Sequence, residues 1–258
     1  MYNKQHINYV GILHTTVTNL SSLGLPNVTI KLQEKNDTNQ FITPLSFINE
    51  HDSDHVYMQY VSDERDLSKD YHNELHCSMV ANLAMFIAAK EYTQLKTKPT
   101  INITQVCMVA VLAGVFHDAG HSLGKHSDRT NIDNAKQIYT STVGDRLNGI
   151  IDGANDLVLE AIDKTIFPRE HVCKRPLKTI DEVIYNSLVD ADSLYTLLHK
   201  NPLTVINALY KERGLNPTNE QLVKDQVDYY TNLTLYTSTG EYLLEKYLPP
   251  HLKNITLK

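Results

Sequence analysis

An all-α domain over residues 67–258, preceded by a small N-terminal extension over residues 1–66, is the fold that the sequence predicts. Apolar residues recur at helical spacing from about residue 68 onward. The stretch from Cys107 to Phe116 is largely apolar and has the length of a buried helix, and Thr179 with Glu182 forms a capping-box pattern. A chain of 258 residues, 41% of them hydrophobic, can bury a large core without disulfide bonds.

The N-terminal extension has a different pattern from the rest of the chain. Residues 28–32 predict a short strand, whereas residues 34–40 and 49–54 are polar and predict loops. We therefore expect short strands in this extension, and we expect the extension to pack against the main domain as a small edge element.

The main domain should be a bundle of helices. Ser68 is the expected N-cap of the first helix, and Pro249-Pro250 should close the ordered part. The expected helices span about 68–94, 104–118, 130–140, 155–166, 179–199, 203–213 and 218–247.

Composition excludes some classes of partner. The 24 Lys and Arg residues against 30 Asp and Glu residues give a net charge of −6, which disfavours non-specific binding to nucleic acid or to anionic membranes. The N-terminus shows no signal-peptide pattern, and no apolar run has the length of a membrane span. The three cysteines form no CxxC pair. We expect a cytoplasmic protein in a reducing compartment.

Histidines and acids gather where a core should be apolar. His72 and His76 project onto the apolar face of the first expected helix, and His117-Asp118 ends the buried helix after it. A further acid, Asp190 or Asp192, lies on the helix that Thr179 caps. Because a buried charge is costly unless it is paired or bound to metal, these residues predict a site for a divalent metal.

The order of these residues resembles the HD-domain metal-dependent phosphohydrolases. Tyr71-His72-Asn73-Glu74-Leu75-His76, then His117-Asp118, then Asp190-Ala191-Asp192 follow that family's order of ligands on a helical bundle. Tyr-His-Asn-x-x-His, together with the segment from His117 to His121, is most similar to the class I 3′,5′-cyclic nucleotide phosphodiesterases. The similarity covers about residues 68–200.

This resemblance implies roles for single residues. His76, His117, Asp118 and Asp192 would hold the first of two divalent metals of the Zn, Mn, Mg or Fe group, and Asp118 would also bridge to the second. His72 would be the general acid that protonates the leaving oxygen. His121 would stand beside the ligands, on the second metal or joined to the site through water. The reaction would turn a 3′,5′-cyclic nucleotide into a nucleoside 5′-monophosphate.

The motifs indicate the metal ligands more directly than they indicate the substrate-binding residues. Gln226 and Tyr229, one turn apart, resemble the glutamine and aromatic that hold the base in the phosphodiesterases, and Lys125 and Arg129 could contact a phosphate. The chain departs from that family at Ser122-Leu123-Gly124-Lys125 and at Phe167-Pro168-Arg169.

Other functions stay open. A nucleotidase, a hydrolase of (d)NTPs or guanosine tetraphosphate, and a non-catalytic HD domain that binds a nucleotide would use a similar fold. A zinc protease is disfavoured because the segment from His117 to His121 lacks the glutamate base of His-Glu-x-x-His.

Overall fold

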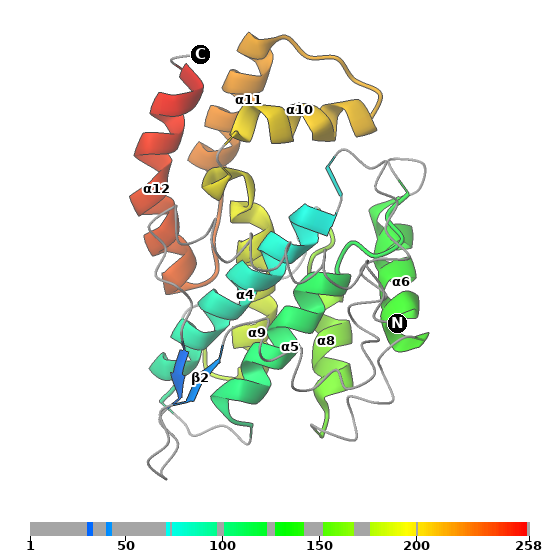
Figure 1. Ribbon diagram of the computed structural model, residues 1–258, viewed down its shortest axis with the longest axis vertical. Coiled ribbons are helices and arrows are strands. Elements are labelled where there is room, and N and C mark those ends of the chain that lie inside the picture. The colour runs from blue at the N-terminus through cyan, green and yellow to red at the C-terminus, as the bar shows by residue number, and fades with distance from the viewer. Residues whose placement is uncertain are drawn as a thin grey trace, which may run out of the picture.

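The computed structural model describes residues 30–32, 40–42, 71–72, 74–96, 101–122, 127–141, 152–167, 176–199 and 201–256. Apart from two short strands, the regular structure in these ranges is helical, which confirms the all-α prediction (Figure 1). The α-helices are α4 (Glu74–Gln94), α5 (Ile103–Phe116), α6 (Asp128–Tyr139), α8 (Ala154–Asp163), α9 (Ile180–Leu194), α10 (Pro202–Glu212), α11 (Asn219–Asn232) and α12 (Ser238–Thr256). A 3-10 helix, η2 (Thr196–Leu198), follows α9.

The N-terminal extension contributes two strands to the described part of the chain. β1 (Ile30–Leu32) pairs antiparallel with β2 (Gln40–Ile42), with Lys31 opposite Phe41. The strand predicted at 28–32 is therefore present over its last three residues. The loops predicted at 34–40 and 49–54 lie outside the described residues, except for Gln40, which begins β2.

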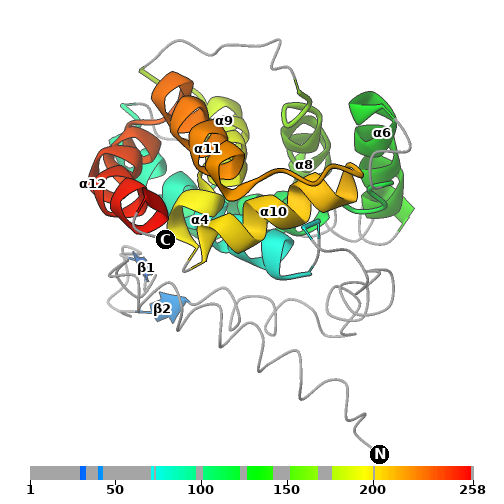
Figure 2. The same cartoon turned by 90° about the horizontal axis from the view of Figure 1, so that it is seen from above.

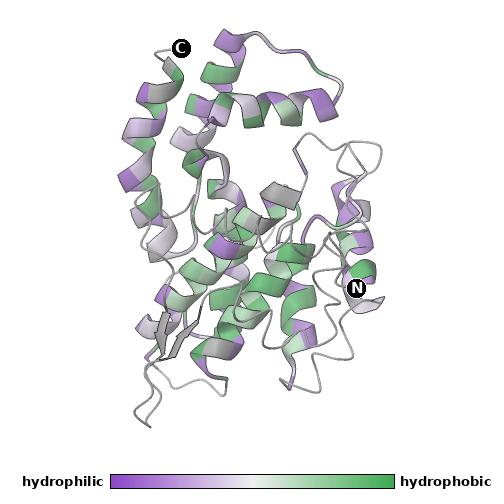
Figure 3. Ribbon diagram, in the orientation of Figure 1, coloured by the Kyte–Doolittle hydropathy of each residue, from purple (hydrophilic) through white to green (hydrophobic). Residues whose placement is uncertain are grey.

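The core forms where α4, α5, α8 and α9 pack together, and the apolar residues of these helices gather there (Figure 3). Asn102 caps α5 through a reciprocal pair of hydrogen bonds with Gln105. Gly114 lets α5 approach α4 closely, because a Cβ at this position would stand 2.4 Å from the Cα of Ala81. The close contact brings the end of α5 beside the start of α4, and these ends carry the candidate site.

Helices α10 and α11 lie at one end of this core, and α12 runs along its side (Figures 1 and 2). The first turn of α12 is fixed by Glu91 on α4, whose carboxylate accepts hydrogen bonds from the Thr239 backbone N–H and from the hydroxyls of Ser238 and Thr239. A carboxylate at this position satisfies N–H groups that have no partner within the helix.

Three helix boundaries differ from the sequence prediction. α4 starts at Glu74 and not at Ser68, so Tyr71 and His72 precede the helix in a bend. The helix expected over 218–247 is two helices, α11 and α12, separated by residues 233–237. Pro249 and Pro250 lie inside α12 and do not end it, since the φ of proline suits a helix and its cost is the missing N–H donors.

The second of these differences has a clear cause. The carboxylate of Asp190, fully buried on α9, accepts hydrogen bonds from the backbone N–H groups of Tyr236 and Thr237 and from the Thr237 hydroxyl, at 2.7–3.1 Å. These bonds hold the connection between α11 and α12 in a non-helical conformation.

None of the described helices is both long enough and apolar enough to cross a membrane.

Candidate metal centre

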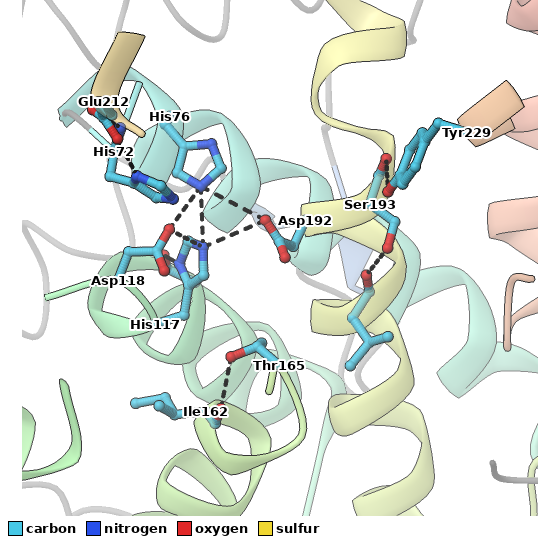
Figure 4. A network of polar contacts seen from close by, with 12 residues as sticks. His72, His76, His117, Asp118, Ile162, Thr165, Asp192, Ser193, Glu212 and Tyr229 are labelled. Carbon is cyan, nitrogen blue, oxygen red and sulfur yellow. Dashed lines mark hydrogen bonds and ion pairs between the residues drawn. The ribbon is translucent and has the colours of Figure 1, made fainter. Parts of the chain in front are cut away.

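Two histidines and two carboxylates from three segments of the chain meet at one point (Figure 4). His76 lies in the first turns of α4, His117 and Asp118 directly follow α5, and Asp192 lies near the end of α9. His76 Nε2 is 3.2 Å from His117 Nε2 and 2.9 Å from Asp118 Oδ2. His117 Nε2 is 3.0 Å from the same Asp118 oxygen, and Asp192 Oδ1 is 3.6 Å and 3.7 Å from the two ring nitrogens.

The ring of His117 is oriented by its own helix. Its Nδ1 lies 2.8 Å from the carbonyl oxygen of Gly114, one turn earlier in α5. A hydrogen bond from Nδ1–H to this carbonyl fixes the tautomer in which Nε2 carries the lone pair. In the neutral ring, the lone pair therefore lies on the atom that faces His76, Asp118 and Asp192.

Burial and charge set the protonation of the cluster. Burial lowers the pKa of His76, and the hydrogen bond with Asp118 offsets this only in part. Burial opposes the charge on His117 too, but Asp118 and Asp192 outweigh it and raise its pKa well above the usual value. Burial also opposes the charge on both carboxylates, yet His117 above all lowers the pKa of Asp118 and of Asp192. The cluster thus carries two anionic carboxylates.

This set of atoms suits a divalent metal. His76, His117 and Asp118 each offer a ligand atom, and these atoms lie within 4.8 Å of one another. Imidazole nitrogens with carboxylate oxygens are the ligands of Zn, Mn and Fe sites in proteins. These three residues could therefore hold a metal ion, and Asp192 adds a fourth donor at slightly greater distance.

The alternative acid, Asp190, lies elsewhere. Its carboxylate accepts hydrogen bonds from the connection between α11 and α12, whereas Asp192 is the acid beside His76 and His117. The geometry therefore agrees with the choice of Asp192 that the family resemblance implies.

His72 lies beside the cluster and is held by a residue that the motifs did not indicate. The Glu212 carboxylate, at the end of α10, lies 2.5 Å from His72 Nδ1 and accepts the backbone N–H groups of Tyr71 and His72 at 2.6 Å and 3.0 Å. Burial opposes the charge on Glu212, but these contacts, first the one with His72, lower its pKa. On its other side His72 stacks on His121, with ring centroids 3.7 Å apart.

A pocket of about 760 Å³ opens over the cluster. Seven residues singled out from the sequence line it: His72, His117, Asp118, His121, Asp192, Gln226 and Tyr229. His76 lies below this lining, fully buried.

Gln226 and Tyr229 form another part of the pocket wall, on α11. Gln226 is 2% exposed, and its Oε1 has no hydrogen-bond partner among the described residues. Tyr229 is 39% exposed and its hydroxyl donates to the Ser193 carbonyl, 3.2 Å away. A buried amide that lines a pocket with unused hydrogen-bonding capacity is suited to a polar ligand.

The structure places one of the two cations expected to contact a phosphate. Arg129 does not line the pocket and pairs with Asp163, at 2.7 Å. Lys125 lies outside the described residues.

Sequence reasoning missed Glu212 and Gly114. Glu212 lies 140 residues from His72, and only the folded chain brings the two together. Gly114 is three residues before His117, and its signal was available, since glycine within an otherwise apolar buried helix indicates a close approach.

Comparison with models of protein families, with curated proteins and with solved structures found no significant match to this chain. The chemistry of the site must therefore be argued from its own residues.

Proposed function

We propose that the protein is a metal-dependent phosphohydrolase, and that its preferred substrate is a 3′,5′-cyclic nucleotide, which it opens to the nucleoside 5′-monophosphate. The observation that carries this proposal is the convergence of His76, His117, Asp118 and Asp192 at the base of one pocket that His72 also lines.

The metal would be held by His76, His117, Asp118 and Asp192. The side chain of Asp118 is more exposed than that of His117, and Asp118 would be shared with a second ion. When bound, a divalent metal lowers the pKa of a water molecule toward neutrality and offsets the charge of the phosphoryl oxygens.

His72 is suited to the role of general acid. Glu212 engages its Nδ1, so Nε2 is the ring atom that remains to carry a proton toward the pocket. The Glu212 carboxylate and the stacked ring of His121 hold the imidazole ring of His72 in place. Donation of this proton to the leaving oxygen contributes about 10²- to 10⁴-fold to the rate in typical enzymes.

Gln226 and Tyr229 support a nucleobase as the organic part of the substrate. An amide offers both a donor and an acceptor, which can pair with the edge of a base, and the exposed face of Tyr229 can stack on it. A small nucleotide is therefore the proposed partner.

The buried thiols of Cys77 and Cys107, neither of which forms a disulfide, fit a reducing compartment, and we propose a cytoplasmic location.

The proposal is tested by hydrolysis of a panel of nucleotides with product identification. Wild-type protein in Mn²⁺, Mg²⁺ or Zn²⁺ should convert 3′,5′-cyclic AMP or GMP to the 5′-monophosphate, and EDTA should abolish the reaction. Asp118→Asn should be inactive, whereas Asp163→Asn, outside the pocket lining, should retain activity.

The same panel separates the alternatives. Turnover of dNTPs, guanosine tetraphosphate or nucleoside monophosphates, without turnover of the cyclic nucleotides, would assign another phosphohydrolase activity. Full activity in EDTA would overturn the metal-dependent reaction, and nucleotide binding without hydrolysis in any metal would indicate a binding domain.

A further inference from the structure

Phe167 is an exposed aromatic residue in the wall of the pocket. Its side chain is 71% exposed, the highest value among the large apolar residues that the structure describes as exposed. Those residues are Phe167, Leu215, Tyr229 and Tyr242. Of these four, Phe167 and Tyr229 line the pocket, so two exposed aromatic side chains of the described residues lie at this site.

The backbone that carries Phe167 is held in place. The Asp128 carboxylate, in the first turn of α6, accepts the Phe167 N–H at 2.5 Å. Two residues earlier, the N–H and the hydroxyl of Thr165 both donate to the Ile162 carbonyl, at 3.1 Å and 2.7 Å. An aromatic ring on an anchored backbone loses little conformational entropy when it contacts a ligand.

Phe167 and Tyr229 belong to different elements of the fold. Phe167 follows α8, Tyr229 is on α11, and α9 with Asp192 lies between these helices (Figures 1 and 2). In the close view Thr165 lies below His117 and Asp118, whereas Tyr229 lies beyond Asp192 and Ser193 (Figure 4). The pocket wall therefore carries two exposed aromatic side chains, one that follows α8 and one on α11.

We infer that Phe167 forms a second base-stacking subsite, and that the pocket also accepts linear dinucleoside phosphodiesters, which carry a base on each ester arm. This inference rests on the proposed phosphohydrolase function. A cyclic mononucleotide has a single base, which Gln226 and Tyr229 can engage, and it leaves Phe167 unused. Stacking is tolerant of base identity because every base has a π face. A pocket of about 760 Å³ lies toward the upper end of the range for ligand sites.

The reaction on a linear substrate balances without any further reagent. Water adds its hydroxyl to phosphorus, the bond between phosphorus and the 3′ oxygen breaks, and the leaving oxygen takes the proton that His72 supplies. The other proton of the water returns to His72 through solvent after product release. The products are one nucleoside with a free 3′ hydroxyl and one nucleoside 5′-monophosphate.

The test compares adenylyl-(3′→5′)-adenosine with 3′,5′-cyclic AMP on wild-type protein and Phe167→Ala, with Mn²⁺ present. Wild type should hydrolyse both substrates. Phe167→Ala should raise KM for the dinucleoside about tenfold or more, as expected for loss of one stacking contact. It should leave KM for cyclic AMP within about twofold. Phe167→Tyr, which keeps an aromatic face, should restore the dinucleoside KM. Tyr242→Ala, which removes an exposed aromatic outside the pocket lining, should change neither value.

Calorimetric titration with the same two compounds in Ca²⁺ separates this inference from the proposed function. Tenfold weaker binding of the dinucleoside alone by Phe167→Ala would support the subsite even if neither compound were hydrolysed. Failure of wild type to bind the dinucleoside, or equal losses for both compounds in Phe167→Ala, would overturn it, and would leave the cyclic nucleotide activity as a separate question.

Discussion

Asp190 and Asp192 lie two residues apart on α9, and a helix turns through about 200° over that interval, so their side chains face nearly opposite directions. Asp190 faces the connection between α11 and α12, and Asp192 faces His76 and His117. One acid thus holds the helices together, and the other lies at the candidate metal centre. The two roles predict different losses on substitution.

Asp190→Ala should lower the free energy of unfolding by about 3 kcal/mol or more, because two backbone N–H groups and a hydroxyl would be buried without an acceptor. Asp192→Ala, whose side chain is 25% exposed, should cost less stability and should abolish metal binding. Urea unfolding and metal analysis of both variants measure the difference. Metal loss in a folded Asp190→Ala protein, with metal retained in Asp192→Ala, would reverse the assignment of the ligand.

His72 can be examined through the leaving group of the substrate. His72→Ala should retain metal and lose about 10²- to 10⁴-fold in kcat on a cyclic nucleotide, since the ribose 3′ alkoxide needs a proton to depart. The loss should shrink strongly with bis(p-nitrophenyl) phosphate, because nitrophenolate is a weak base and leaves unprotonated. Steady-state rates on both substrates make the comparison. Equal losses would show that His72 positions the phosphate or the metal and does not donate the proton.

At the scale of elements, the site depends on how closely α5 approaches α4. Gly114 lies against the backbone of Ala81, and the carbonyl of Gly114 orients the ring of His117. His76 belongs to α4 and His117 follows α5, so the distance between these helices sets the distance between their ring nitrogens. A change in helix packing is therefore also a change in the metal centre.

Gly114→Ala should cost about 3 kcal/mol of folding stability, because the new methyl group would meet backbone atoms that cannot move aside. The better helix propensity of alanine offsets only about 1 kcal/mol. Metal affinity should fall with stability, as His117 moves away from His76.

Gly153→Ala is the control: its φ of 73° makes alanine strained, but its Cβ would meet nothing within 4 Å. This control should lose about 1–2 kcal/mol with unchanged metal affinity, and an unchanged affinity in Gly114→Ala would contradict the coupling.

At the scale of the whole molecule, the helices could be predicted, and His76, His117 and Asp118 could be proposed as ligands, because their signals are local. Helical periodicity, the Thr179–Glu182 capping box and the buried His117-Asp118 pair are each visible within a few residues. What could not be predicted depends on contacts between distant segments. Asp190 divides the last expected helix through bonds to residues 46 and 47 positions away, and Glu212 reaches His72 across 140 positions.

Arg129 shows that nearness in sequence does not by itself bring a residue to the pocket wall. It follows the His-Asp motif closely, but α6 turns it toward Asp163 on α8. The ion pair with Asp163 accounts for this cation without any substrate.

Metal binding should stabilise the entire helical domain, because the candidate ligands come from α4, the end of α5 and α9, which form its core. A metal at 100 times its Kd adds about 2.7 kcal/mol to the free energy of unfolding. For a domain of this size that corresponds to a rise in Tm of about 5–10 °C. Thermal unfolding of EDTA-treated protein with and without Zn²⁺ or Mn²⁺ measures this shift, which should vanish in His76→Ala and Asp118→Asn and persist in Asp163→Asn.

The metal-induced rise in Tm should also depend on pH, and it should be larger at higher pH. Asp118 and Asp192 overcome the effect of burial and raise the pKa of His117 well above its usual value, so without metal its Nε2 carries a proton near neutrality. A metal must displace that proton, and its apparent affinity should therefore fall as the pH is lowered. The pairing of protonated His117 with the carboxylates meanwhile stabilises the metal-free protein below the raised pKa and is lost above it. Raising the pH from 6 to 8 at constant free metal concentration should thus enlarge the metal-induced rise in Tm. A shift that stays constant, or is larger at pH 6, would show that the metal binds without displacing a proton from His117.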